Sequence, residues 1–206
     1  MSKKVAKYNS RLYTLFAVAV VLLVITAVLA SSRRIGGYEL SLFRFINDWS
    51  ENFRQVFLVI TFLGGVWMFL VAVLLSLWQK RRGLAVRIII FGSTSFLATE
   101  LLKRLIARPR PTDLIDNVHL RETFALGYGF PSGHTAVATT VSLLLFPLLP
   151  PRWRWGCLAW IILVGVSRIY LGVHAPLDVI GGFAVGVVVI CSSALTNHKL
   201  VTKITH

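Results

Sequence analysis

Three short segments of the chain concentrate cationic, hydroxyl and imidazole side chains. They are Lys103-Arg104-(x3)-Arg108-Pro109-Arg110-Pro111, Pro131-Ser132-Gly133-His134 and Ser167-Arg168-(x5)-His174-(x3)-Asp178. Arginine suits bidentate contact with phosphate oxygens, and lysine adds a point charge. Histidine serves as a nucleophile or transfers protons near neutral pH. These residue types together indicate chemistry on a bound phosphate.

The first segment combines cations with two prolines. Pro109 and Pro111 stop a helix and favour an extended backbone, so Arg110 can fold back toward Lys103. Two cations can then clamp one anion. Taken alone, the segment is equally typical of a basic fringe that binds lipid headgroups at a membrane surface.

The second segment opens an apolar run and predicts a helix N-terminus. Ser132 can cap that helix, and Gly133 lets an anion approach the free backbone N–H groups at the positive end of the dipole. His134 then stands where it can donate a proton to a leaving oxygen. Considered alone, the segment favours the alternative of a capped helix with an incidental histidine.

The third segment places an ionisable residue, Arg168, near the end of an apolar run, which marks a functional candidate. Pro176 suits the first turn of a helix, so Asp178 can reach back to His174. A carboxylate on one ring nitrogen leaves the other free as a nucleophile, and attack on phosphorus gives a phosphohistidine. A structural His–Asp pair is commoner in isolation, but the three segments together favour catalysis.

Six apolar runs must position these residues. The 206-residue chain is 56% hydrophobic with a mean hydropathy of +0.73, which leaves too few polar residues to cover a soluble fold. Each run approaches the roughly 20 residues that cross a bilayer. The runs are Leu12 to Ala30, Val56 to Leu77, Leu84 to Leu102, Gly133 to Leu149, Trp155 to Leu171 and Leu177 to Leu195. We expect an all-α polytopic membrane protein, one domain over residues 1–206, with six transmembrane helices and its active-site motifs within residues 103–178.

A further helix is expected between the first two runs. Apolar residues recur there at helical spacing, which predicts a short interfacial helix within residues 38–53. They are Leu42, Phe45, Ile46, Trp49 and Phe53. Two interpretations of this segment are equally good: a connection that merely covers the spans, and an element that guides the lipid.

The distribution of basic residues predicts the orientation. Lysine and arginine favour cytoplasmic span ends, which places both termini and the turns at residues 79–83 and 150–154 inside. The inner side then holds twelve cations and no acid: Lys3, Lys4, Lys7, Arg11, Lys80, Arg81, Arg82, Arg87, Arg152, Arg154, Lys199 and Lys203. The net charge of +14 therefore indicates a bilayer partner rather than nucleic acid. We expect a plasma-membrane protein whose active site lies at the extracytoplasmic face.

The three segments resemble the signature motifs of the type 2 phosphatidic acid phosphatase superfamily, in its membrane branch. The resemblance covers residues 103–178, and earlier residues match only in topology. It implies that His174 is the nucleophile, Asp178 its partner and His134 the general acid. The resemblance further implies a group of residues that hold the phosphoryl oxygens: Lys103, Arg110, Ser132, Gly133 and Arg168.

The resemblance also implies a reaction without a metal or other cofactor, because the cations supply the charge stabilisation. No clustered carboxylates suggest a metal site, and Cys157 and Cys191 fall inside apolar runs. Glu100 stands one turn before Lys103 and Arg104, so we expect it to pair with one of them.

The motifs account for phosphate binding but do not identify the lipid that carries the phosphate. The chain resembles the bacterial phosphatidylglycerophosphate phosphatases of the superfamily, which implies hydrolysis of phosphatidylglycerophosphate. Undecaprenyl pyrophosphate and phosphatidic acid are the alternatives, and selectivity is expected within residues 38–53 and 112–130. A phosphate-recognising transporter or receptor is an alternative from another class, but it would have no use for the histidines. The soluble vanadate-dependent haloperoxidases are a second enzymatic alternative, because their anion pocket resembles these motifs, but the six apolar runs argue against it. We infer a phospholipid partner and no obligatory protein partner.

Overall fold

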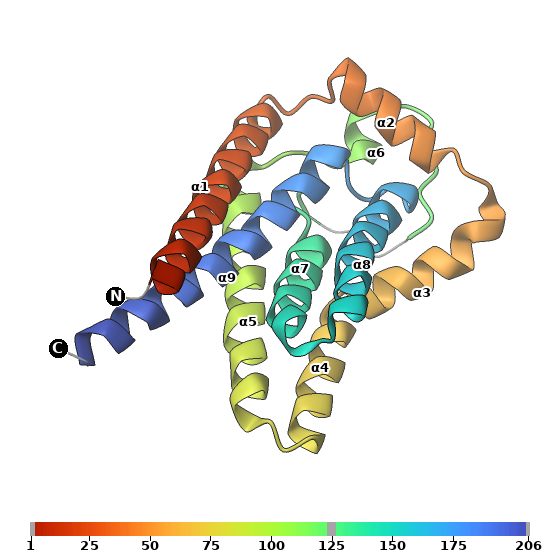
Figure 1. Cartoon of the computed structure of the whole chain (residues 1–206). Helices are drawn as coiled ribbons and strands as arrows, with labels where there is room; N and C mark the ends of the chain where they lie inside the picture. The colour runs from red at the N-terminus through yellow and green to blue at the C-terminus, as the bar shows by residue number, and fades with distance from the viewer. Residues whose placement is uncertain (1–2, 123–126, 205–206) are drawn as a thin grey trace.

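A computed structural model describes residues 3–122 and 127–204, and this part of the chain is built from helices and connecting loops, without strands (Figure 1). The elements are α1 (Lys3–Ser31), α2 (Gly37–Asn47), η1 (Glu51–Phe53), α3 (Arg54–Gly64), α4 (Val66–Trp78), α5 (Arg82–Ile106), α6 (Pro111–Leu114), α7 (Gly133–Leu145), η2 (Phe146–Leu148), α8 (Pro151–Tyr170) and α9 (Pro176–Ile204). The expected all-α class is confirmed. Residues 123–126 of the predicted selectivity loop lie outside the described residues.

Three helices are long and apolar enough to cross a bilayer. They comprise Ser10–Ser31, Arg82–Leu114 and Pro176–Leu195, and the bent pair α3 and α4 is a fourth candidate. The fourth predicted run forms α7, which has only 13 residues before Pro147 enters the 3-10 turn η2. The fifth forms α8, a 20-residue helix with Arg152 and Arg154 near its start and Arg168 in its last turn. By length and composition the described helices therefore supply up to four spans, and the predicted six are not confirmed.

The second predicted run, Val56 to Leu77, is not one continuous helix. α3 and α4 meet at 53°, and the break falls at Gly64 and Gly65. Adjacent glycines weaken a helix because they add backbone freedom and bury no side chain. A Cβ at Gly64 would lie 2.5 Å from Val164 Cγ2, so the missing side chain lets the bend pack tightly against α8.

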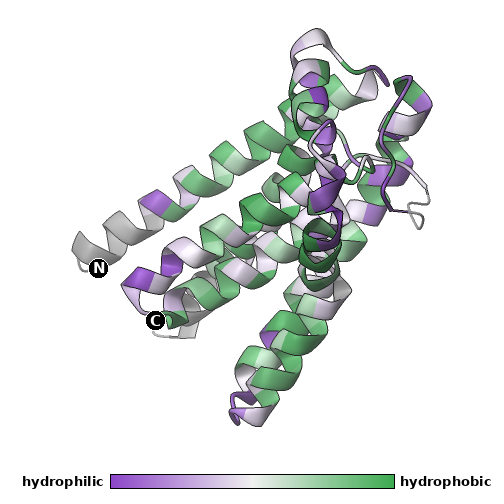
Figure 2. Cartoon of the chain, turned by 90° about the vertical axis from the view of Figure 1, so that its right-hand side faces the viewer, coloured by the Kyte–Doolittle hydropathy of each residue, from purple (hydrophilic) through white to green (hydrophobic). Residues whose placement is uncertain are grey.

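α7 is the central helix, flanked by α5, α8 and α9 (Figure 1). Its residues from Thr135 to Ser142 are buried. Glycines on α9 permit the close approach: a Cβ at Gly182 would lie 2.4 Å from the Ser132 carbonyl oxygen, and one at Gly186 would lie 2.6 Å from Thr139 Cβ. Figure 2 shows hydrophobic residues along the helices and hydrophilic ones gathered toward their ends, as a bilayer requires.

The helix expected within residues 38–53 is present as α2 followed by η1. α2 packs against the ends of α8 and α9, with Phe43 buried against Tyr170. Asn47 fixes this contact: its Nδ2 donates to the Tyr170 carbonyl at 3.0 Å, and its Oδ1 accepts from the His119 N–H at 3.0 Å. α2 thus braces the loop that follows α8.

Candidate active site

His174 lies in the loop between α8 and α9 and is almost fully buried. Its Nδ1 is 3.4 Å from Asp178 Oδ2, which is long for a hydrogen bond. Pro176 begins α9, and Asp178 occupies the first turn, where its Oδ2 accepts from the Ala175 N–H at 2.9 Å. The sequence therefore places this pair locally: a proline-started helix brings the carboxylate back to the imidazole.

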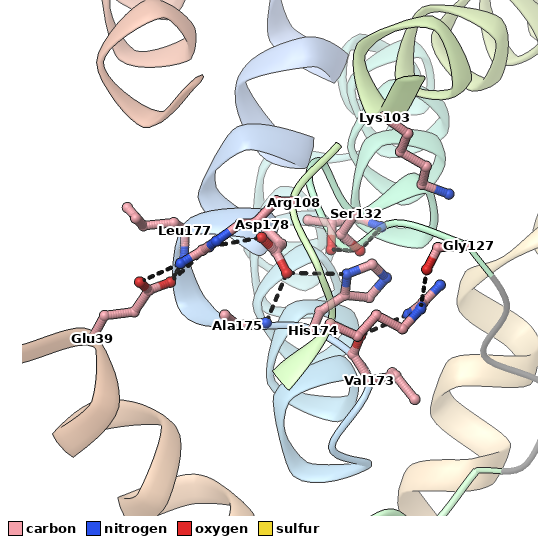
Figure 3. Close-up of polar contacts among 12 residues, drawn as sticks. Glu39, Lys103, Arg108, Gly127, Ser132, Val173, His174, Ala175, Leu177 and Asp178 are labelled. Carbon is pink, nitrogen blue, oxygen red and sulfur yellow. Dashed lines mark hydrogen bonds and ion pairs between the residues drawn. The ribbon is translucent and has the colours of Figure 1, made fainter. Parts of the chain in front are cut away.

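The other carboxylate oxygen of Asp178 faces a cation that sequence reasoning left without a role. Arg108 Nη1 donates to Asp178 Oδ1 at 2.9 Å, and both side chains are fully buried. The guanidinium also forms two hydrogen bonds to Glu39 on α2 (Figure 3). The sequence did not indicate Glu39 as a site residue either, because no short-range spacing relates it to the three motifs.

The three predicted phosphate-binding cations come from separate elements. Lys103 lies in the last turn of α5, and its Nζ is 2.7 Å from Glu100 Oε1, as expected from their spacing. Arg110 is the N-cap residue of α6, where Nε donates to the Gly127 carbonyl at 2.9 Å and Nη1 to the Val173 carbonyl at 2.7 Å. Arg110 is thereby anchored beside the His174 loop.

Burial and nearby cations change the pKa of His174, the candidate nucleophile. Burial lowers the pKa of His174 well below its ordinary value, and the charges of Arg168, Arg110 and Lys103 lower it further, while a hydrogen bond with the Gly129 backbone raises it. The net effect keeps the imidazole neutral near pH 7. A neutral ring with its proton on Nδ1, the nitrogen that faces Asp178, carries its lone pair on Nε2.

Arg168, in the last turn of α8, carries partners that the sequence did not reveal. Its Nη1 donates to Glu122 Oε2 at 2.6 Å and to Thr61 Oγ1. A phosphate oxygen bound by this guanidinium would compete with the Glu122 carboxylate. The contact spans 46 residues of sequence, so no short-range pattern could have indicated it.

The second segment forms the expected helix N-terminus. Ser132 is the N-cap of α7, with its Oγ accepting from the Thr135 N–H at 3.5 Å, and its own N–H donates to the Asp178 carbonyl at 2.8 Å. A Cβ at Gly133 would meet only Thr99 Oγ1, at 3.6 Å. The start of α7 is thus tied to α9 while the side of Gly133 stays uncrowded.

His134 lies at the edge of a 410 Å³ pocket. The residues that line it are Leu58, Thr61, Phe62, Trp67, Glu122 and His134. Gly65, at the bend of α3 and α4, packs directly on the imidazole, since a Cβ there would lie 2.6 Å from His134 Nε2. Thr61 and Glu122, which both accept from Arg168 Nη1, line the same pocket, so His134 lies near Arg168.

The arrangement brings a neutral buried imidazole, a second imidazole and three cations to one end of the helix bundle. Such a set can bind a phosphoryl group, attack its phosphorus and protonate the leaving oxygen. Within residues 3–122 and 127–204, no group of three or more His, Cys, Asp or Glu side chains could hold a metal ion. Cys157 and Cys191 are both free thiols.

Comparison with known proteins gives consistent matches. The family model described as the PAP2 superfamily matches residues 83–201. The undecaprenyl-diphosphatase of Sulfolobus acidocaldarius is 32% identical over 155 residues, covering 73% of this chain and 74% of that protein. Phosphatidylglycerophosphatase B of Bacillus subtilis is 37% identical over 109 residues, covering 48% and 50%. The crystal structure of a transmembrane PAP2-type phosphatidylglycerolphosphate phosphatase from Bacillus subtilis superposes with a TM-score of 0.67 at 26% identity, covering 88% and 96%.

Proposed function

This chain belongs to the PAP2 superfamily, and from that premise we propose that it is a membrane lipid phosphatase that hydrolyses phosphatidylglycerophosphate to phosphatidylglycerol. One observation carries the proposal: the buried imidazole of His174 faces the Asp178 carboxylate, and Arg110 is anchored beside it on the Val173 carbonyl. The similarity to the Bacillus subtilis phosphatase named for this substrate, in sequence and in crystal structure, supports the choice of lipid.

The proposed reaction has two steps. The lone pair of His174 Nε2 attacks phosphorus, the bond from phosphorus to the lipid oxygen breaks, and His134 donates a proton to that oxygen. A water molecule then attacks the phosphohistidine and gives a proton to His134, and the phosphorus–nitrogen bond breaks to release inorganic phosphate. Asp178 stabilises the positive charge that His174 carries between the two steps.

The same geometry supports a reaction without a metal ion. Charge on the equatorial phosphoryl oxygens must be offset in the transition state, which metal ions do in many phosphoryl-transfer enzymes. Here Lys103, Arg110 and Arg168 would supply this charge, with the N–H groups at the start of α7. We therefore expect full activity in the presence of EDTA.

Undecaprenyl diphosphate is the second candidate substrate. The observation in its favour is the relative named undecaprenyl-diphosphatase, whose similarity extends over 73% of this chain, against 48% for the relative named phosphatidylglycerophosphatase B. Both substrates present a terminal phosphate on a lipid, so the same catalytic residues would serve either.

A turnover assay tests the proposal. Purified protein in detergent with EDTA is offered phosphatidylglycerophosphate, undecaprenyl diphosphate, phosphatidic acid and lysophosphatidic acid, and kcat/KM is measured from phosphate release. His174→Ala should abolish turnover while the protein stays folded. His119→Ala is the matched control, because that exposed histidine also pairs with an aspartate, Asp48, at 3.7 Å. Full activity of His174→Ala would overturn the mechanism, and phosphate binding without turnover would favour the transporter or receptor.

We also propose six spans, with α7 and η2 forming the fourth and α8 the fifth. The termini lie in the cytoplasm and the site at the outer face of the plasma membrane. In support, α2 lies at one end of the bundle, and the turn between α4 and α5 lies at the other (Figure 1). Single cysteines at Thr112 and Gly83, in a background without Cys157 and Cys191, should give labelling of intact cells by an impermeant thiol reagent at Thr112 only. Labelling at Gly83 only would reverse the orientation.

A further inference from the structure

A chain of ionic contacts leads from α2 to the nucleophile through Arg108. The guanidinium donates from Nη1 to Glu39 Oε1 at 3.0 Å and from Nη2 to Glu39 Oε2 at 2.6 Å. Nη1 also reaches Asp178 Oδ1 at 2.9 Å, and Asp178 Oδ2 lies 3.4 Å from His174 Nδ1. Figure 3 shows the four side chains in one line, with the imidazole at its end.

The local backbone directs Arg108 into this position. α5 ends at Ile106, and the left-handed conformation of its C-cap residue Ala107 (φ 50°) turns the chain away from the helix axis. The Arg108 carbonyl then accepts from the Gly129 N–H at 2.8 Å, and its Nη2 donates to the Arg34 carbonyl at 2.8 Å. A buried guanidinium is costly unless it is paired and hydrogen-bonded, and here two carboxylates and a carbonyl accept from it.

Glu39 also contacts the helix that carries the carboxylate. Its Oε1 accepts from the Leu177 N–H at 3.0 Å, in the first turn of α9. A negative charge is favourable at this end of a helix because it offsets the free N–H groups of the first turn. Glu39 therefore holds both Arg108 and the start of α9, one residue before Asp178.

These contacts fix the carboxylate that orients the imidazole. Arg108 holds Asp178 Oδ1 and the Ala175 N–H holds Oδ2, so the carboxylate plane is set relative to the His174 ring. The charge of Glu39 offsets that of Arg108. The charge of Asp178 is therefore left to stabilise the imidazolium that forms when Nε2 bonds to phosphorus.

We infer that Arg108 and Glu39 are positioning residues for phosphoryl transfer: they orient Asp178, and through it His174, and they keep the charge of Asp178 available to the imidazolium. This inference rests on the proposed function. Neither residue touches the reacting atoms, because Asp178 stands between Arg108 and the imidazole.

The central test removes the charge of Glu39 while keeping its shape. Glu39→Gln should reduce kcat by roughly tenfold to a hundredfold, as small losses of catalytic alignment do, with KM close to the wild-type value. Glu51→Gln is the matched control, because Glu51 pairs with the buried Arg121 at 2.7 Å and lies outside the line to His174. It should leave kcat and KM unchanged.

The pH profile supplies a readout that a merely structural role would not move. In Glu39→Gln the charge of Arg108 is no longer offset, which disfavours an imidazolium at His174 and lowers its pKa. The acid limb of kcat/KM should therefore shift to lower pH. The other charged or titratable groups that act on His174 are unchanged in this variant: Lys103, Arg110, His134, Arg168 and Asp178.

A double-mutant cycle tests whether Glu39 acts through Arg108. Arg108→Gln should also reduce kcat, and Arg108→Lys, which keeps the charge without the planar fork, should retain more activity. Adding Glu39→Gln to Arg108→Gln should cause no further loss, because the two residues form one unit. Additive losses would overturn the inference.

The outcomes separate this inference from the proposed function. If the wild type turns over and His174→Ala does not, then wild-type kcat in Glu39→Gln, or an equal loss in Glu51→Gln, overturns the positioning role alone. If the wild type turns over no substrate, the proposed function fails. Orthovanadate binding by titration calorimetry then tests the positioning separately. Weaker binding in Glu39→Gln than in Glu51→Gln supports it, and equal binding overturns it.

Discussion

Replacing Gly65 by alanine is expected to displace the proposed general acid. A Cβ at this position would lie 2.6 Å from Nε2 and 2.7 Å from Cδ2 of His134. Non-bonded atoms of this kind prefer a separation of about 3.5 Å, so the imidazole must move by roughly 1 Å. The ring is the free end of the His134 side chain, and it can give way without a change in the backbone of α7.

The size of the effect follows from the displacement. A misplacement of about 1 Å can cost about 10²-fold in rate, and general acid catalysis contributes roughly 10² to 10⁴-fold. We therefore expect kcat of Gly65→Ala on a lipid phosphate to fall by about 10²-fold. With p-nitrophenyl phosphate the loss should be less than about tenfold, because that leaving group departs without needing a proton.

The neighbouring glycine provides the matched control. A Cβ at Gly64 would lie 2.5 Å from Val164 Cγ2, so Gly64→Ala overpacks the same bend without touching a histidine. It should lower the free energy of unfolding by about 1 to 3 kcal/mol and keep most of kcat. Phosphate release from both substrates, with thermal unfolding in detergent, measures these effects. Wild-type kcat in Gly65→Ala, or equal losses on the two substrates, would refute the reasoning.

Three further outcomes are expected. Because burial and nearby cations lower the pKa of His174, the imidazole stays neutral into mild acid, and the acid limb of kcat/KM should fall below pH 6.5; a limb at or above this value contradicts the assignment. Glu122→Gln removes the carboxylate that competes for Arg168, so KM should fall about fivefold in steady-state assays, and a raised KM would show that Glu122 assists binding. Asn47→Ala removes the amide that accepts from the His119 N–H and donates to the Tyr170 carbonyl, and should lower the free energy of unfolding by about 1 to 3 kcal/mol in thermal denaturation; an unchanged midpoint would argue against the brace.

Local chemistry made much of the helix class and the motif geometry predictable. Ser132 caps a helix because its hydroxyl reaches an N–H three residues on, and Pro176 starts one because it lacks the N–H that a first turn leaves unused. Asp178 then lies in the first turn of that helix, close enough to reach back to His174 in the preceding loop. The membrane helices were predictable in the same way, because the length and apolar composition of a single segment are enough to identify a candidate span.

The contacts that complete the site depend on tertiary packing. Arg108 meets Glu39 across 69 residues of sequence, and Arg168 meets Thr61 across 107. The need for two glycines at the α3–α4 bend is explained only by Val164 and His134, which pack against them. Capping and helical spacing act within a few residues, so the sequence determined them directly. Which distant side chain offsets a buried charge, or fills the space beside a glycine, is decided only when the helices pack.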